Sequence, residues 1–173
     1  MDLRYPIGTY EPAPFTPTLK AERIADIRFL PGLLERALEN LDATQLQTPY
    51  REGGWTLQQV VHHLADSHMN AFCRVKLLVT EEMPAVRPFD ENAWALTAEN
   101  YTVPVNVSVT LLHALHTRWA ALLDALPDAA WHRTYYHPLT QQTADLWYLT
   151  GMYAWHGRHH VAQITSLRER MGW

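Results

Sequence analysis

Apolar residues recur every three or four positions in four long stretches of the chain, which is the spacing of an amphipathic helix. The stretches are approximately Thr18–Asn40, Thr56–Glu82, Ser108–Leu126 and Gln142–Arg170. In the last stretch the steps alternate between three and four residues along Leu146, Leu149, Tyr153, His156, His160, Gln163 and Leu167. Such a seam faces the interior of a helical bundle. The pattern therefore predicts an all-α four-helix bundle with long inter-helix connections.

Proline and glycine residues suggest where these helices stop. Pro31 and Gly32 interrupt the first stretch and predict a kink or a break there. Four prolines within residues 1–17 predict an extended or irregular start to the chain. The long connection 84–106 has a short helical pattern around Asp90–Leu96, and Trp131–Thr140 is predicted to be a loop. Pro127 ends the third helix.

Composition narrows the class of protein. With 173 residues, 47% of them hydrophobic, and no internal repeat, the chain is expected to form one domain over residues 1–173. A net charge of −4 without a basic stripe argues against nucleic-acid binding. Cys73 is the only cysteine, which excludes a disulfide framework or a cysteine-based metal cluster. No signal-peptide pattern and no apolar run of about 20 residues is found, so we expect a soluble, cytoplasmic protein.

Two of the ten histidines occupy the seam of the fourth helix, where leucine would be expected. His156 and His160 are four residues apart, so their side chains leave the same helix face and could hold one divalent metal. The alternative is two separate core histidines, each hydrogen-bonded to a neighbour. A pair on the seam favours metal binding. His159 lies about 60° around the helix from His156 and is expected to flank the site.

The spacing leaves the third ligand open. His68 falls within the apolar stripe of the second helix and His63 lies on its edge, so both are candidates. His62 points to the opposite face and is predicted to be solvent-exposed. His113 and His116, on the third helix, are more typical of packing residues. The segment Tyr135–Pro138 could cover a site or form a structural turn with aromatic side chains.

Several motifs, spread over the whole chain in order, resemble a known family. They are Tyr5-Pro6-Ile7-Gly8, Thr48-Pro49-Tyr50-Arg51, Gly53-Gly54-Trp55-Thr56, the run from Gln59 to Asn70 that contains HHLADSH, Tyr136-His137-Pro138, Tyr153-Ala154-Trp155-His156 and Met171-Gly172-Trp173. This set is similar to the YfiT-type metal-dependent hydrolases of the DinB-like four-helix superfamily.

The resemblance implies a DinB-like bundle with one divalent metal per subunit, zinc in preference to nickel or another ion. It implies His63, His156 and His160 as the metal ligands, and so favours His63 over His68 as the third. It also implies a cytoplasmic homodimer that acts on a small molecule. Related DinB-like proteins include thiol S-transferases, which use the metal to activate a low-molecular-weight thiol.

The predicted metal site is compatible with three functions. Three neutral imidazoles leave a metal its full charge, so a bound water can ionise near pH 7 and attack an ester or amide. The same site could instead hold a thiol as thiolate, or bind metal without catalysis. No carboxylate has the spacing of the general base in HExxH, and Asp66 is either an acceptor for the His63 ring or a solvated residue. The side chains expected to be near substrate are Ser67, Asn70 and Arg74.

Overall fold

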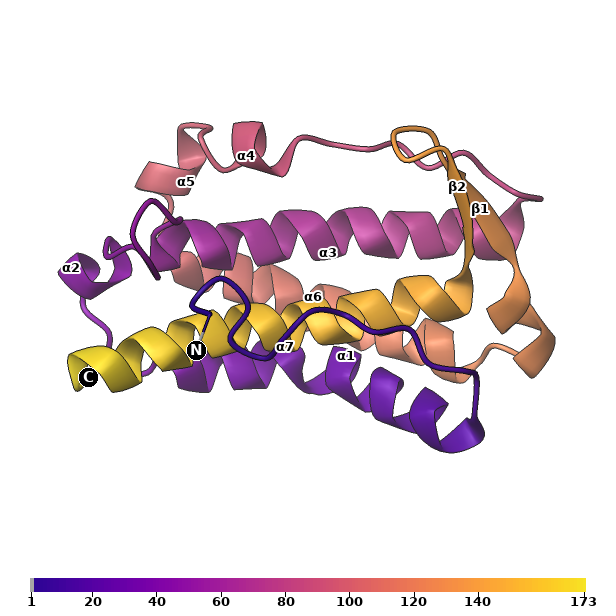
Figure 1. Cartoon of the computed structure of the whole chain (residues 1–173), viewed down its shortest axis with the longest axis horizontal. Coiled ribbons are helices and arrows are strands. Elements are labelled where there is room, and N and C mark those ends of the chain that lie inside the picture. Colours follow the sequence, from indigo (N-terminus) through magenta and orange to yellow (C-terminus); the bar gives the residue numbers. More distant parts are fainter. Residues whose placement is uncertain (1) are drawn as a thin grey trace.

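The computed structural model describes residues 2–173 and has four long helices that run along a common axis (Figure 1). They are α1 (Pro17–Leu38), α3 (Leu57–Thr80), α6 (Val105–Asp124) and α7 (Leu146–Met171). Both α1 and α3 pack against α6 and α7, so each long helix has two long neighbours. The four-helix bundle predicted from the apolar spacing is confirmed. None of the helices in residues 2–173 combines the length and apolar character needed to cross a membrane.

Polar residues cap three of the long helices at their first turn. The Thr16 hydroxyl accepts a hydrogen bond from the Leu19 amide, ahead of Pro17 in the first helical position. Thr56 and Gln59 form a reciprocal capping box at the start of α3. The Asp145 carboxylate caps α7. Side-chain acceptors satisfy amides that have no partner within a helix, so these residues fix where the bundle helices begin.

Of the two outcomes predicted at Pro31 and Gly32, a break is wrong, because α1 continues through both residues. Proline removes only the amide that would bond the carbonyl four residues earlier, here that of Ile27. The His116 ring donates a hydrogen bond to that carbonyl instead. The missing helical hydrogen bond is thereby replaced from a neighbouring helix, and α1 has no need to end.

The connections contain short elements that the periodicity missed or placed loosely. The short helix predicted around Asp90–Leu96 is confirmed as α4 (Glu91–Trp94). Two further single-turn helices, α2 (Ala43–Leu46) and α5 (Glu99–Thr102), were not predicted. The connection that holds α4 and α5 passes over α3 and contacts it (Figure 1).

The segment predicted as a loop after the third helix is largely regular, which corrects that prediction. A 3₁₀ helix at Asp128–His132 leads into an antiparallel hairpin of β1 (Thr134–His137) and β2 (Gln142–Asp145). As a result α7 begins at Leu146 and not at Gln142. Tyr136 exchanges backbone hydrogen bonds of 3.0 Å with Pro84 and Val86, which ties the hairpin to the connection over α3.

The hydrophobic core has two halves, one on each side of a layer of histidines. The half near the hairpin contains Ile27, Ala71, Trp119, Trp131, Trp147 and Tyr153. The other half contains Leu30, Val60, Leu64, Leu112, Ile164 and Leu167. Between them on their helices lie four imidazoles, of which those of His68, His116 and His160 are buried and that of His156 is partly buried. The core therefore positions a polar layer across the middle of the bundle.

Candidate metal centre

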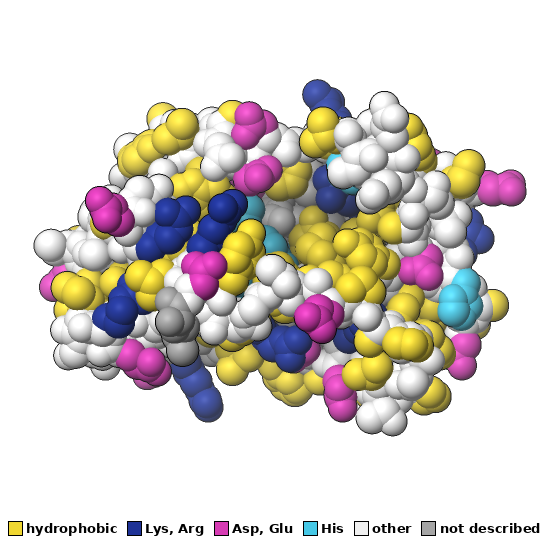
Figure 2. Space-filling view, in the orientation of Figure 1, with side chains coloured by type: hydrophobic (Ala, Val, Ile, Leu, Met, Phe, Trp, Pro, Cys, Tyr) yellow, Lys and Arg dark blue, Asp and Glu magenta, His cyan; other side chains and the backbone are white. Residues whose placement is uncertain are grey.

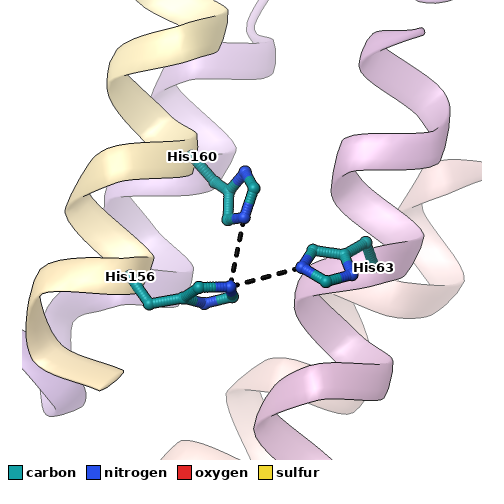
Figure 3. A group of neighbouring side chains, drawn as sticks. All are labelled: His63, His156 and His160. Atoms are coloured by element: carbon teal, nitrogen blue, oxygen red, sulfur yellow. Dashed lines mark hydrogen bonds between the residues drawn. The ribbon is translucent and has the colours of Figure 1, made fainter. Parts of the chain in front are cut away.

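Three histidines bring their Nε2 atoms together between α3 and α7 (Figure 3). The Nε2 atom of His156 lies 3.2 Å from that of His63 and 3.1 Å from that of His160. One ligand atom from each of the three lies within 4.8 Å of the others. His156 and His160 project from one face of α7, as their spacing predicts. Of the two candidates left open on α3, His63 is the one that joins them.

The His160 ring is fixed by the side chain of Gln163. The Nδ1 atom of His160 lies 2.8 Å from Oε1 of Gln163, whose Nε2 donates to the Arg4 carbonyl at 3.2 Å. Because a carbonyl can only accept, the Gln163 amide has its NH₂ toward Arg4 and its oxygen toward His160. His160 must therefore donate from Nδ1, which leaves a lone pair on Nε2 facing the other two rings.

Burial keeps the three imidazoles neutral. It lowers the pKa of His63 to about 4, and the nearby His159 imidazole adds to this effect. Burial also lowers the pKa of His156 and His160 well below the usual value. Neutral imidazoles are the form that binds metal, and lone pairs at these separations are best satisfied together by a cation among them. The donor set fits a divalent ion such as zinc, which prefers nitrogen ligands.

The three histidines form part of the wall of a cavity of about 370 Å³. Figure 2 shows this hollow in one face of the molecule, with histidine side chains visible inside it and apolar side chains around it. The aromatic and aliphatic part of the wall comes from Trp55, Phe89, Leu139, Met152, Tyr153 and Trp155. A metal held by three histidines would therefore face a space of small-molecule size, as a catalytic site requires.

Arg74 gives the cavity wall a positive charge. Its guanidinium donates to the Tyr153 hydroxyl at 3.2 Å and to the Arg87 carbonyl at 2.9 Å. No carboxylate within residues 2–173 forms an ion pair with it. Ser67 lines the same cavity, whereas Asn70 donates to the Asp66 carbonyl and lies outside this wall. Of the three side chains expected near substrate, the structure places Ser67 and Arg74 at the cavity.

A second cavity, of about 240 Å³, adjoins the first and shares Trp55, Glu91, His159 and His160 with it. Arg4 and Arg51 line this second space. His159 stacks on Trp155 with ring centroids 4.7 Å apart and forms part of both walls. It flanks the three-histidine cluster, as its angle around the helix predicts.

The prediction that His62 is solvent-exposed is wrong. His62 is buried, with Nδ1 2.7 Å from the Ser108 hydroxyl and Nε2 3.0 Å from the Val103 carbonyl. Periodicity identified the face of α3 opposite the core, but the segment leading into α6 covers that face. Helical spacing identifies the side of a helix that faces the core. It does not reveal that a connecting segment covers the opposite side.

Asp66 does not orient the His63 ring in the part of the chain that the structure describes. It is half-buried, and burial together with the nearby Glu99 raises the pKa of its carboxyl to about 6. His113 pairs with Glu35 at the surface, with an N–O distance of 3.0 Å. His68 is buried as predicted for an inward-facing residue, but it meets the Nδ1 atom of His156 at 3.1 Å and not the point where the Nε2 atoms converge.

Sequence comparison places the chain in a family. A profile described as the DinB superfamily matches residues 27–164. The chain belongs to the DinB superfamily. The resemblance found from its motifs is thereby confirmed.

Relatives within the DinB superfamily match over nearly their whole length. Proteins of Geobacillus kaustophilus and Geobacillus thermodenitrificans are 52% and 50% identical over 172 residues, covering 99% of this chain and 97% of each relative, and both are named as candidate metal-dependent hydrolases. The solved structure of YfiT from Bacillus subtilis is 47% identical with a TM-score of 0.97, covering 100% of this chain and 99% of that one. It is described as a candidate metal-dependent hydrolase with an unusual four-helix bundle topology. The names leave the reaction class open.

Proposed function

We propose that this protein is a metal-dependent hydrolase in which His63, His156 and His160 bind one divalent metal, most favourably zinc. The observation that carries the proposal is the convergence of three Nε2 atoms, from two buried histidines and one partly buried histidine, at the wall of a cavity. A metal bound by three neutral nitrogens supplies a Lewis acid with room for water or substrate. The names of the relatives support metal dependence.

The residues around the centre have separable tasks in this proposal. The protein holds three imidazoles deprotonated at one point, and Gln163 keeps the His160 ring turned toward it. Trp55 packs against the His63 ring with centroids 4.7 Å apart and limits the water that reaches it. Arg74 offers a positive charge to an anionic or strongly polarised group of the substrate. The cavity volume suits a small molecule.

The metal content of single variants tests directly which histidines are the ligands. We expect close to one metal per chain in the purified protein and a large loss in His63→Ala, His156→Ala and His160→Ala. His62→Ala is the matched control, since it also removes a buried imidazole from α3 but outside the cluster. Elemental analysis by mass spectrometry provides the measurement. Loss of metal in His62→Ala with retention in His63→Ala would contradict the assignment.

The reaction class needs a second measurement. We expect the zinc-loaded protein to hydrolyse members of a panel of activated esters and amides, and the chelated protein and His156→Ala to show only background rates. The same panel with a low-molecular-weight thiol tests the rival reaction. Thiol conjugates in place of hydrolysis products would overturn the hydrolase proposal in favour of S-transfer, and metal binding without any turnover would overturn both. Zinc as the physiological metal, a homodimer and a cytoplasmic location stay predictions.

A further inference from the structure

A row of histidines leads from the candidate metal centre through the core to α1. The Nδ1 atom of His156 lies 3.1 Å from Nε2 of His68, and Nδ1 of His68 lies 3.1 Å from Nε2 of His116. The Nδ1 atom of His116 then lies 2.5 Å from the Ile27 carbonyl oxygen. His68 and His116 are fully buried, and their rings stack with centroids 5.0 Å apart. The row therefore links all four long helices through their interior.

At the far end of the row, the hydrogen bond between His116 and Ile27 can have only one direction, and this direction sets the polarity of the row. In an uninterrupted helix the Ile27 carbonyl would accept from the amide of residue 31. That residue is Pro31, which has no amide hydrogen, so the carbonyl remains available. A carbonyl oxygen can only accept a hydrogen bond. His116 must therefore carry a hydrogen on Nδ1.

This polarity propagates along the row, because an imidazole buried among neutral partners is uncharged and carries one ring hydrogen. With its hydrogen on Nδ1, His116 accepts at Nε2, so His68 must donate from Nδ1. His68 then accepts at Nε2, so His156 must donate from Nδ1. The Nε2 atom of His156 is left with a lone pair that faces His63 and His160.

We propose that His68 and His116 are positioning residues that hold His156 in its metal-binding tautomer, anchored on the Ile27 carbonyl that Pro31 leaves free. The proposal rests on the metal centre proposed above and extends it to residues 88 and 40 positions away from His156 in the chain. Partners of the non-ligating nitrogen commonly change metal affinity by about 10–100-fold. A row kept only for packing would be replaceable by apolar side chains without effect on the metal.

Zinc affinity separates positioning from packing. We expect His116→Leu to weaken zinc binding by about 10–100-fold, because His68 loses its acceptor and His156 its fixed tautomer. His116→Gln should retain most of the affinity, since one amide can accept from His68 and donate to Ile27. The control is His62→Leu, another buried histidine replaced by leucine, which should bind zinc as the unmodified protein does. Competition with a chromophoric chelator at fixed pH gives the affinities, and circular dichroism of each metal-free variant reports folding.

Imidazole nitrogen chemical shifts of the metal-free, unmodified protein give an independent readout that needs no variant. Two-bond proton–nitrogen correlation spectra at pH 8 should show the Nδ1–H tautomer for His156, His68 and His116. The Nε2–H tautomer at His156 would overturn the proposal, even if His116→Leu fails to fold. Unchanged zinc affinity in a folded His116→Leu would also overturn it and leave the metal centre standing. Absence of zinc binding by the unmodified protein would instead contradict the proposed metal centre, and with it the role of His68 and His116.

Discussion

At the scale of single residues, the candidate centre is defined by which nitrogen of each ring has a partner. His160 is set by Gln163, and His156 by His68. Both rings therefore direct Nε2 toward the same point, as does His63. Burial also makes these imidazoles difficult to protonate, and that property affects the stability of the metal-free protein.

The metal-free protein is expected to lose stability as the pH falls from about 6.5 toward 4. Burial lowers the pKa of His63 and His116 from 6.5 to about 4, so between these values the unfolded chain binds protons that the folded chain does not. The stability is therefore complete above pH 6.5 and is lost on acidification. One such imidazole accounts for about 3 kcal/mol. Asp66 and Asp26 act in the opposite sense, since a raised pKa favours the folded state on protonation, but more histidines have a lowered pKa than carboxyls have a raised one.

Urea unfolding of chelated protein at a series of pH values measures this effect. The urea midpoint should be level from pH 7 to 8 and fall steadily below pH 6.5. A midpoint that stays constant or rises on acidification to pH 5 would show that these histidines are not buried in neutral form in the native state.

The sequence predicted the residues of the site better than their surroundings. His156 and His160 follow from helical spacing, because two side chains on one helix have a fixed geometry. His63 could not be chosen over His68 by spacing, since the choice depends on how α3 is rotated against α7. The contact of His116 with Ile27 could not be predicted from spacing either, because it joins two different helices. Its one local signal is Pro31 within a helical pattern.

At the scale of elements, close packing of α7 on α1 depends on a missing side chain beside the metal centre. A Cβ atom on Gly157 would lie 2.7 Å from a terminal carbon of Leu30. Leu30 is only 2% exposed, so its side chain has little room to move away. Gly157 is thus a point of close approach between α7 and α1, one residue after His156.

Two glycine substitutions should have opposite effects on stability. Gly157→Ala is expected to lower the free energy of unfolding by about 1–3 kcal/mol, because the added methyl group overpacks the contact with Leu30. Gly32→Ala is the matched comparison in α1, where a Cβ atom meets nothing within 4 Å. It should raise the free energy of unfolding by about 0.5–1 kcal/mol through the gain in helix propensity. Chemical denaturation of both variants measures the difference, and destabilisation by Gly32→Ala would contradict the unbroken path of α1.

Elements were predictable from the sequence in proportion to their length. The four long helices carry several turns of periodic signal, so their existence follows from the sequence. The hairpin has two four-residue strands and lies in an aromatic, polar stretch without alternation, so it was mistaken for a loop. The break expected at Pro31 was wrong because a side chain from another helix replaces the lost hydrogen bond.

At the scale of the whole molecule, the histidine layer separates two apolar halves that each draw on the long helices. Metal binding is therefore not the main source of folding energy, unlike in a small zinc-dependent domain. We expect the chelated protein to keep its helical circular dichroism and to melt at a lower temperature than the metal-loaded form. Free zinc at 100 times its dissociation constant should add about 2.7 kcal/mol. A random-coil spectrum after chelation would show that folding does depend on the metal.

The extended segment before α1 has a practical consequence for anyone preparing this protein. It runs along α7 (Figure 1), with the Ala13 carbonyl accepting from the Trp147 indole at 2.7 Å and the Arg4 carbonyl accepting from Gln163 at 3.2 Å. A polyhistidine purification tag fused ahead of this segment would put flexible imidazoles within reach of the cavity mouth. Such imidazoles can occupy the open coordination positions and inflate the measured metal stoichiometry. A tag placed after α7, whose last turn lies at the end of the bundle (Figure 1), keeps the affinity handle and the metal chemistry apart.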